Sequence, residues 1–262
     1  MTIVIKMGGH ALDNLDPTAP VLVALARDVA ELSARGESVV LVHGGGPQIN
    51  ELLETAGVVS TFVDGLRVTD ATAMRYVDMA LASVNRAIVA ALNWQGVRAV
   101  GVSGVDGTLL SASPLGATWG HVAGDPRVNA SVLRALAEKN FIPVVSPVAS
   151  SPTGALLNCN ADTAAGAIAG ALDADSLVLL SDISQVRTNP DDASTGVDRV
   201  SLTEVAEMIA SGAAREGMLP KLSAAAVALQ AGARRVWLAN GLQPHAVRDV
   251  LNGTTTTTEV VA

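Results

Sequence analysis

The fold class is decided by the stretch Val39-Val-Leu-Val-His-Gly-Gly-Gly-Pro-Gln-Ile-Asn50. Its first four residues form an apolar, β-branched run typical of a buried strand, and three glycines follow His43. Pro47 then suits the first position of a helix, where its missing N–H is not needed. A strand that passes through glycines into a helix leaves bare amides at the positive end of the helix dipole. The stretch therefore predicts a strand-loop-helix unit that binds an anion.

Five more apolar runs of this kind occur along the chain, with alanine-rich helical segments between them. The runs are residues 3–5, 99–102, 141–145, 177–180 and 236–238. Helices are expected at residues 19–35, 47–56, 70–93, 129–139, 161–172, 202–211 and 221–230. Glycine-rich stretches at 62–68 and 108–124 predict hairpins, and the threonine run 254–258 predicts a terminal strand. Apolar strands that alternate with helices are typical of an α/β fold with a mostly parallel sheet covered on both faces.

Composition narrows the class of protein. The chain has 262 residues, 49% of them hydrophobic, which is enough for a large core in one domain, 1–262. No apolar run approaches the roughly 18 residues needed to span a bilayer, and the opening residues do not form a secretory signal. The lone Cys159 excludes an internal disulfide and fits a cytoplasmic location. The net charge of -8 argues against general affinity for nucleic acid or anionic membranes.

A second glycine loop follows the first strand. Lys6-Met-Gly-Gly9 repeats the strand-to-glycine design and adds a cation, in a chain with three lysines against fourteen arginines. Lysine offers a compact, mobile ammonium that can follow a phosphoryl group. Because ligands of open α/β sheets lie at the carboxyl ends of the strands, the two loops are expected to converge on one phosphate. The alternative is that both are tight turns without a ligand.

Other phosphate-binding and hydrolytic motifs are missing from the sequence. No Gly-x-x-x-x-Gly-Lys-Ser/Thr stretch occurs, and Gly44-Gly-Gly46 does not match Gly-x-Gly-x-x-Gly. His-Gly-Gly-Gly also occurs in the oxyanion loop of some esterases, which need a Gly-x-Ser-x-Gly nucleophile. The nearest stretch, Gly101-Val-Ser-Gly-Val105, lacks the final glycine, which argues against a hydrolase.

Three further polar stretches are candidates for a site. Arg67 precedes a helix and could grip a carboxylate at two points, although a solvated surface arginine is the alternative. At the next expected helix start, Asn160 suits the N-cap and Asp162 could hold two lysines in position. Glu216-Gly-Met-Leu-Pro-Lys221 places a lysine at a helix start, against the dipole, which favours a role in binding an anion. No cluster has metal-ligand spacing, so no protein-bound metal is expected.

Together these motifs resemble the amino acid kinase family, and within it the branch that phosphorylates N-acetyl-L-glutamate. The resemblance extends from Ile3 to Thr254. The matching stretches are Lys6-Met-Gly-Gly9, His43-Gly-Gly-Gly-Pro-Gln-Ile-Asn50, Asp64-Gly-Leu-Arg-Val-Thr-Asp70, Val84-Asn-Arg86, Gly101-Val-Ser-Gly-Val-Asp-Gly107, Asn158-x-Asn-Ala-Asp162, Leu180-Ser-Asp182, Gly217-Met-Leu-Pro-Lys221 and Gly253-Thr254. The third and sixth stretches separate this branch from carbamate, uridylate and aspartate kinases.

The resemblance implies a three-layer αβα sandwich in which about residues 1–172 bind the acceptor and about 173–262 bind the nucleotide. It implies transfer of the ATP γ-phosphoryl, with Mg2+ bound through the nucleotide, to the side-chain carboxylate of N-acetyl-L-glutamate in arginine biosynthesis. Lys6 and Lys221 would stabilise the transferring phosphoryl, and Asp162 would organise both lysines. These roles agree with the physics of phosphoryl transfer, which depends on positioning and charge neutralisation.

The resemblance also assigns binding residues. Amides of the two glycine loops would cradle the phosphate and the reacting carboxylate, and Arg67 and Asn158 would bind the rest of the acceptor beside Gly44 and Gly45. The nucleotide would lie against Gly8, Gly9, Asp182, Ile183, Ser184, Gln185, Val186, Arg187, Ala213, Ala214 and Arg215. Gln185 stands where the family usually has glycine, so its side chain could crowd the nucleotide or force a different turn.

Two alternative functions stay open. One is a sister kinase that acts on glutamate or 2-aminoadipate attached to an amino-group carrier protein, and the intact stretch at residues 43–50 argues against it. The other is a silent family member that senses nucleotide or effector, which the presence of both lysines and Asp162 disfavours. Arginine-inhibited members carry an extra N-terminal helix, whereas the first strand here begins at residue 2 or 3. A homodimer that arginine does not inhibit is therefore expected.

Overall fold

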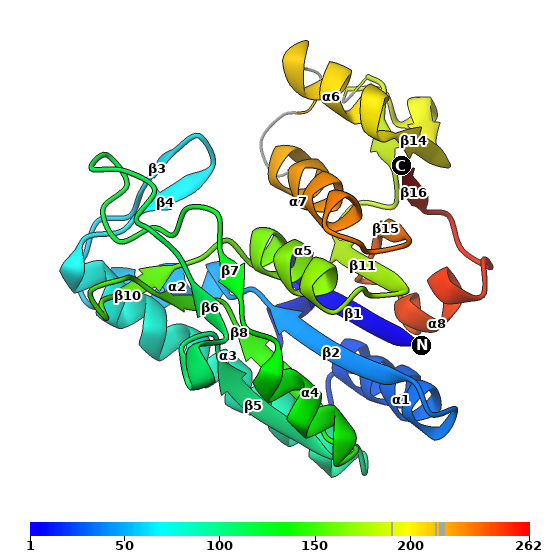
Figure 1. Cartoon of the computed structure of the whole chain (residues 1–262), viewed down its shortest axis with the longest axis horizontal. Coiled ribbons are helices and arrows are strands. Elements are labelled where there is room, and N and C mark those ends of the chain that lie inside the picture. Colours follow the sequence, from blue (N-terminus) through cyan, green and yellow to red (C-terminus); the bar gives the residue numbers. More distant parts are fainter. Residues whose placement is uncertain (190, 213, 215–217) are drawn as a thin grey trace.

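The computed structural model describes residues 1–189, 191–212, 214 and 218–262 (Figure 1). The helices are α1 Pro20–Ala34, α2 Gly46–Thr55, α3 Ala71–Trp94, α4 Ser131–Glu138, α5 Ala161–Ala171, α6 Leu202–Ala210, α7 Met218–Gln230 and α8 Ala246–Leu251, with short 3-10 turns η1 Gly9–Leu12, η2 Asp106–Thr108 and η3 Ala193–Thr195. The strands are β1 Thr2–Met7, β2 Ser38–His43, β3 Thr61–Val63, β4 Leu66–Val68, β5 Ala99–Ser103, β6 Leu110–Ser111, β7 Arg127–Val128, β8 Ile142–Ser146, β9 Val148–Ser150, β10 Leu156–Asn158, β11 Ser176–Ser181, β12 Val186–Arg187, β13 Gly196–Val197, β14 Arg199–Ser201, β15 Val236–Asn240 and β16 Thr258–Val261.

The central sheet has eight strands in the order β14-β16-β15-β11-β1-β2-β8-β5. The six apolar runs predicted from the sequence form its parallel part, whereas β16 pairs antiparallel with β15 and parallel with β14. In the middle of the sheet, β1 pairs with β2 on one side and with β11 on the other. Strands from both halves of the chain thus share one sheet, and the carboxyl ends of β1, β2 and β11 lie next to one another.

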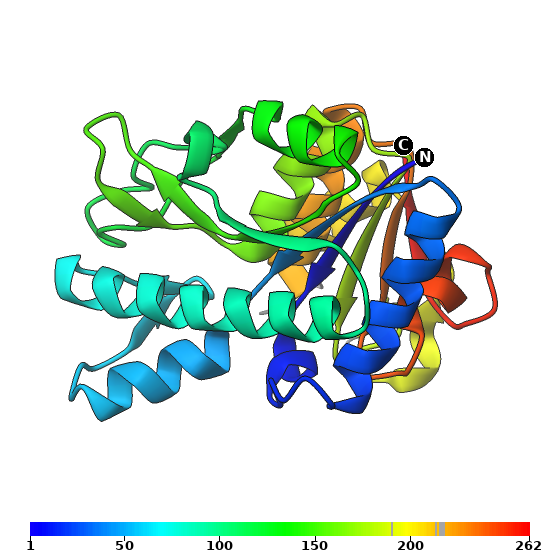
Figure 2. The same cartoon turned by 90° about the horizontal axis from the view of Figure 1, so that it is seen from below.

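The two faces of this sheet carry separate cores, because alternate side chains of a strand point to opposite faces. Val4 and Val40 pack into one core with residues of α4, α5 and α7. Ile3 and Ile5 pack into the other core with residues of α1, α3 and α8. Figure 2 shows the resulting layers, with α1 (blue) and α3 (teal) on one side of the sheet and α4 (green), α5 (yellow-green) and α7 (orange) on the other. The expected αβα sandwich is confirmed.

Smaller sheets lie beyond the carboxyl end of β2. The four-stranded sheet β10-β9-β6-β7 and the predicted hairpin β3–β4 occupy the same end of the molecule (Figure 1). The segment around Gly120 connects them: Thr69 donates its amide to the Trp119 carbonyl, and Asn158 donates its amide to the His121 carbonyl. The two stretches that carry Arg67 and Asn158 are thereby held on either side of one connecting segment.

Three expected boundaries differ from the structure. Helix α7 begins at Met218, three residues before the expected start, so Lys221 lies inside the first turn rather than at the terminus. The terminal strand is residues 258–261, where Val260 is buried; of the threonine run, Thr258 alone is in it. Residues 108–124 do not form the expected regular hairpin. They contain one isolated bridge, Pro114–Ala123, and strand β6 at their start pairs with β7 and β9. Burial of Val260, rather than threonine content, sets the terminal strand.

Candidate active site

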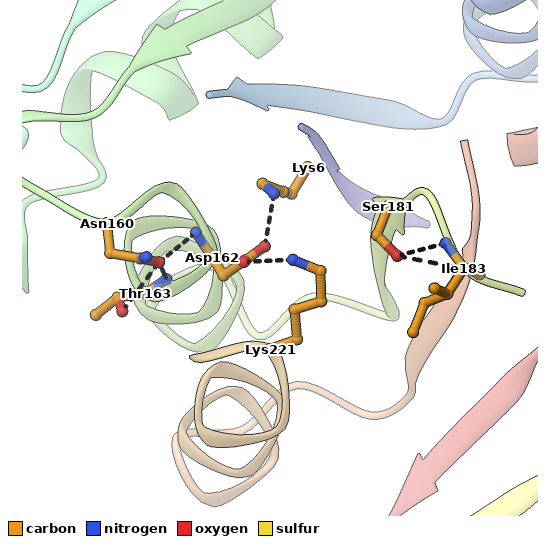
Figure 3. Close-up of polar contacts among 7 residues, drawn as sticks. All are labelled: Lys6, Asn160, Asp162, Thr163, Ser181, Ile183 and Lys221. Atoms are coloured by element: carbon orange, nitrogen blue, oxygen red, sulfur yellow. Dashed lines mark hydrogen bonds and ion pairs between the residues drawn. The ribbon is translucent and has the colours of Figure 1, made fainter. Parts of the chain in front are cut away.

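A buried cluster of three charged side chains lies where β1, α5 and α7 meet (Figure 3). Lys6 Nζ is 2.8 Å from Asp162 Oδ1, and Lys221 Nζ donates to Asp162 Oδ2 at 3.0 Å. Side-chain exposure is 6% for Lys6, 5% for Asp162 and 14% for Lys221. The cluster has one positive charge in excess, so it favours an additional anion.

Burial and mutual interaction shift the titration of this cluster. Burial lowers the pKa of Lys6, and Lys221 lowers it further, while Asp162 opposes both. Burial alone would raise the pKa of Asp162, but the two neighbouring ammonium groups outweigh it and hold that pKa below its usual range. Asp162 is therefore a stable counter-ion, and it is not available as a general base near neutral pH.

The local fold places Asp162 between the lysines. Asn160 caps α5, and its side-chain oxygen accepts from the amides of Asp162 and Thr163 at 2.9 and 3.0 Å (Figure 3). Asn160 thus has the predicted capping role, which fixes the first turn of the helix on which Asp162 stands.

Gly8 is required by the position of Lys6. A Cβ on Gly8 would lie 2.1 Å from Lys6 Nζ, so any larger residue would displace the ammonium group. Gly9 begins the turn η1 directly after it. The glycines of this first loop therefore give the lysine its place at the end of β1.

A cavity of about 160 Å³ adjoins the charged cluster and brings together all four residues predicted to bind the acceptor. Its wall includes Gly44, Gly45, Arg67 and Asn158, and it continues along residues 159–161 to the start of α5. The structure therefore brings the second glycine loop together with the arginine and asparagine stretches.

The amides of the second glycine loop are not equivalent. Gly44 donates its N–H to the Met7 carbonyl at 2.8 Å, which extends the pairing of β1 and β2. Gly45 is the N-cap of α2, and the first amides of a helix lack acceptors within the helix. A Cβ on Gly45 would meet Leu81 of α3 at 3.0 Å. The donor expected from Gly44 is thus already engaged in the sheet, whereas those of Gly45 and the first turn of α2 suit an anion.

Arg67 is buried and held from three sides. Its guanidinium donates to Asn50 Oδ1 at 2.8 Å and to Ser60 Oγ, and it lies 4.7 Å from the centre of the Phe62 ring. Burial lowers its pKa, as the charged form has lost water. Among the described residues no carboxylate pairs with it, so this is a buried cation that lacks an anionic partner. The alternative of a solvated surface arginine is excluded.

Asn158 lies at the end of β10 and donates to Thr69 Oγ1 at 3.2 Å. Thr69 in turn donates to the Arg67 carbonyl at 2.8 Å. Next to Asn158, burial raises the pKa of Cys159 to about 12, so this thiol is neutral and not a nucleophile. The pocket thus offers charge and hydrogen bonds to a ligand, without a covalent nucleophile from this cysteine.

The predicted nucleotide residues are spread more widely. Asp182, Ile183, Ser184 and Gln185 follow β11 at the carboxyl edge of the sheet, and Asp182 is close enough to Lys6 to raise its pKa. The side chains of Val186 and Ala214 are buried in the apolar core, and their amides donate to Thr258 Oγ1 and to the Met208 carbonyl. Arg187 is half-buried in β12. Ala213 and Arg215 lie outside the described residues.

Gln185 turns its side chain toward the protein. Its amide donates to Asp198 Oδ1 at 2.6 Å and to the Thr257 carbonyl at 3.3 Å, and a Cβ on Gly196 would meet its Oε1 at 2.5 Å. The residue that departs from the family pattern therefore ties the loop after β11 to the segment before β16.

Several residues of the site have no assigned role in the sequence analysis. His43 and Asn85 form a buried pair behind the second glycine loop, and Asn50, Ser60 and Phe62 surround Arg67. His43, Asn50 and Asn85 occur within the motifs quoted from the sequence, and this membership could have identified them as site residues. Ser60 and Phe62 precede the motif, and only the hairpin geometry brings them to the arginine.

The described part of the chain shows neither a metal-binding cluster nor a membrane-spanning helix. No group of three or more His, Cys, Asp or Glu side chains there is arranged to hold a metal ion. None of the described helices is long and apolar enough to cross a membrane.

Comparison with known proteins agrees with this geometry. The fold and the paired buried lysines define a class of α/β phosphotransferases that act on small molecules. The model of the "Amino acid kinase family" matches residues 1–240. The chain belongs to the amino acid kinase family, whose members use ATP.

Individual relatives are consistent with this. Acetylglutamate kinase from Ruegeria sp. (strain TM1040) is 42% identical over 246 residues, which are 94% of this chain and 84% of the relative. Acetylglutamate kinase from Archaeoglobus fulgidus is 40% identical and covers 94% of this chain and 88% of its own length. Among solved structures, smu.665 from Streptococcus mutans UA159 has a TM-score of 0.83 at 30% identity and covers 100% of this chain and 98% of its own.

Proposed function

We propose that this protein transfers the γ-phosphoryl group of ATP to the side-chain carboxylate of N-acetyl-L-glutamate, forming an acyl phosphate and ADP in the pathway to arginine. The observation that carries the proposal is the adjacency of the Lys6–Asp162–Lys221 cluster to the pocket of Arg67. One group of cations serves the phosphoryl and a separate cation serves the acceptor. The relatives named acetylglutamate kinase supply the particular acceptor.

The reaction requires no covalent intermediate on the protein. An oxygen of the acceptor carboxylate attacks the γ-phosphorus, the bond to the β,γ-bridging oxygen breaks, and ADP leaves with that electron pair. Lys6 and Lys221 balance the charge on the moving phosphoryl oxygens, and Asp162 keeps both ammonium groups in place. The carboxylate is already ionised at neutral pH, so no general base is needed.

Mg2+ enters this proposal through the nucleotide. The one buried carboxylate of the cluster, Asp162, already pairs with both lysines, so it suits a counter-ion better than a metal ligand. Bound to the nucleotide phosphates, Mg2+ neutralises their charge. Asp182 lies at the carboxyl end of β11 beside this region and is the described carboxylate that would face such a complex.

The second carboxylate of the acceptor pairs with Arg67. A planar guanidinium holds a carboxylate at two points, and its bonds to Asn50 and Ser60 fix the plane of the fork. Asn158 adds a donor and an acceptor, which suit the acetamido group. This arrangement leaves the side-chain carboxylate to meet the phosphoryl near Gly45.

ADP release in the presence of ATP and Mg2+ tests the proposal. We expect release with N-acetyl-L-glutamate and little with glutamate, aspartate or no acceptor. Release only with glutamate or 2-aminoadipate on a carrier protein would favour the sister kinase. No release with any acceptor, together with nucleotide binding, would favour a sensor.

We also propose a homodimer. Strand β5 forms an edge of the sheet, and next to it α3 exposes Met79 and Trp94, which are 57% and 62% exposed. A second copy against this edge would cover both apolar groups. Light scattering that gives the mass of a monomer would contradict the dimer. The cytoplasmic location and the division into an acceptor half and a nucleotide half stay predictions.

A further inference from the structure

His43 is a buried, titratable residue that the reaction as described does not use. It is the last residue of β2 and is 1% exposed. Its Nδ1 is 2.8 Å from the Gly44 carbonyl oxygen, and its Nε2 is 3.1 Å from Asn85 Nδ2. Both ring nitrogens are therefore engaged immediately behind the second glycine loop.

The partners of His43 fix its tautomer. Asn85 Nδ2 also lies 2.8 Å from the Val144 carbonyl, which can only accept, so this atom is the donor nitrogen of the amide. His43 Nε2 must then accept from it, and the ring proton is on Nδ1, where it is donated to Gly44. Burial lowers the pKa of His43 to about 4, which keeps the ring neutral at physiological pH.

Asn85 reaches this position from α3 across the sheet. A Cβ on Gly101 of β5 would lie 2.0 Å from Asn85 Oδ1, so the glycine leaves room for the amide to cross to β8 and His43. Asn85 is itself only 8% exposed. The histidine is thus oriented by a residue of α3 whose amide lies against β8 and β5, on the side of β2 away from β1.

The trans peptide unit between Gly44 and Gly45 connects the hydrogen bond of His43 to the acceptor cavity. The Gly44 carbonyl and the Gly45 N–H belong to the same planar peptide unit and point in opposite directions. Holding the carbonyl toward His43 therefore directs the Gly45 N–H away from the histidine. Gly44 and Gly45 both line the acceptor cavity, and Gly45 has no acceptor for its amide among the described residues.

We infer that His43 is a positioning residue, which holds the Gly44 carbonyl so that the Gly45 amide donates to the reacting carboxylate–phosphoryl group. This inference rests on the proposed function. Two glycines in succession can rotate their shared peptide plane at little cost, so without an external bond the amide would be poorly aimed. The histidine supplies that bond from the side of the peptide that the substrate never touches.

Two substitutions separate positioning from general support of the fold. His43→Leu removes both ring nitrogens, whereas His43→Asn retains a donor at the position of Nδ1. Deleting a hydrogen-bond donor at a developing charge lowers kcat by about 10²–10³. In His43→Leu the Gly45 amide is still present but poorly aimed, so kcat should fall by a smaller factor, roughly 10- to 100-fold. His43→Asn should recover most of kcat. Both variants lose the bond from Asn85 and should lower Tm to a similar degree, and KM for ATP should stay unchanged in both.

His245→Leu is the matched control. His245 Nδ1 is 2.6 Å from the buried Asp28 in α1, and neither residue lines the acceptor cavity. Its replacement should lower Tm and leave kcat unchanged. Wild-type kcat in His43→Leu would overturn the inference, and so would equal loss of kcat in His43→Leu and His43→Asn.

A measurement on the unmodified protein decides the matter if both variants fail to fold. Imidazole ¹⁵N chemical shifts should show His43 protonated on Nδ1 and unchanged between pH 6 and 8, since the ring is neutral throughout. An Nε2–H tautomer or an imidazolium would overturn the inference. Lack of turnover by the wild type with N-acetyl-L-glutamate would instead count against the proposed function, which these shifts do not test.

Discussion

The proposed acceptor pocket and the proposed nucleotide loop both lie near the Lys6–Asp162–Lys221 cluster, yet they are built in different ways. We define the acceptor pocket by Gly44, Gly45, Arg67 and Asn158, and the nucleotide loop by residues 182–187. In the pocket, the functional side chain is buried and its orientation is fixed by neighbours, as Asn50 and Ser60 fix Arg67. In the loop, Asp182 and Ser184 are exposed, and the well-bonded side chain, Gln185, is directed to other parts of the chain.

This difference indicates which region selects among ligands. A buried, preoriented cation discriminates strongly, because a ligand without the matching carboxylate leaves it unpaired. An exposed loop contributes weaker contacts that substitutions alter only modestly. We therefore expect large, acceptor-specific effects from changes in the pocket, small effects from changes in the loop, and the largest effects at the cluster that both regions share.

The largest effect is expected at the shared lysines. Lys6→Ala and Lys221→Ala should each lower kcat by about 10²–10³, because each removes a charge from the moving phosphoryl. Steady-state kinetics with both substrates and thermal unfolding measure the two consequences separately. Lys139→Ala, at the carboxyl end of α4, is the control and should be silent. Near-normal turnover in both site variants would end the proposed mechanism.

Within the pocket, Arg67→Lys should raise KM for N-acetyl-L-glutamate by at least about tenfold, because an ammonium cannot reproduce the fork that grips a carboxylate. Losing a charge-assisted pair in a closed site costs about 2–5 kcal/mol, which permits an even larger effect. KM for ATP should hardly change. A variant that binds ATP more weakly, or that alters neither constant, would show that the arginine is not in the acceptor site.

The sequence predicted the chemistry of both regions more fully than their geometry. Apolar runs gave the central strands, since burial on both faces of a parallel sheet leaves an unbroken hydrophobic pattern. Glycines after β1 and β2 located the loops, and the few lysines pointed to Lys6 and Lys221. The direction of each amide was not predictable, because Gly44 is paired to Met7 only once β1 and β2 lie side by side.

The side chains that surround Arg67 could not be predicted from the sequence either. Phe62 and Ser60 reach it because β3 pairs with β4, which sets Phe62 opposite Arg67. Lys221 was expected at the start of a helix, after the glycine of the stretch Gly217-Met-Leu-Pro-Lys221. In α7 the helix begins two residues before that proline, and the lysine reaches Asp162 from inside the first turn.

A smaller effect on the pocket side is expected from Phe62→Ala. The ring lies 4.7 Å from the Arg67 guanidinium and is 55% exposed, a geometry worth about 0.5–1 kcal/mol. KM for the acceptor should rise roughly two- to fivefold, while KM for ATP stays constant. Val59→Ala, an 85% exposed apolar residue just before the hairpin, is the matched control and should change nothing. A rise in the ATP constant instead would place the hairpin against the nucleotide.

The smallest effect is expected in the loop, from Gln185→Ala. The side-chain amide bonds Asp198 and the Thr257 carbonyl, and its loss removes hydrogen bonds with a net worth of about 0.5–1.5 kcal/mol each. Tm should therefore fall slightly. Because the side chain is directed into the protein, KM for ATP should change by less than about threefold, and KM for the acceptor should not change. Asp198→Asn retains an oxygen that can accept from Gln185, so it should be milder than Gln185→Ala in thermal unfolding. A tenfold change in KM for ATP would mean that Gln185 leaves these partners to contact the nucleotide, and the loop would then be as specific as the pocket.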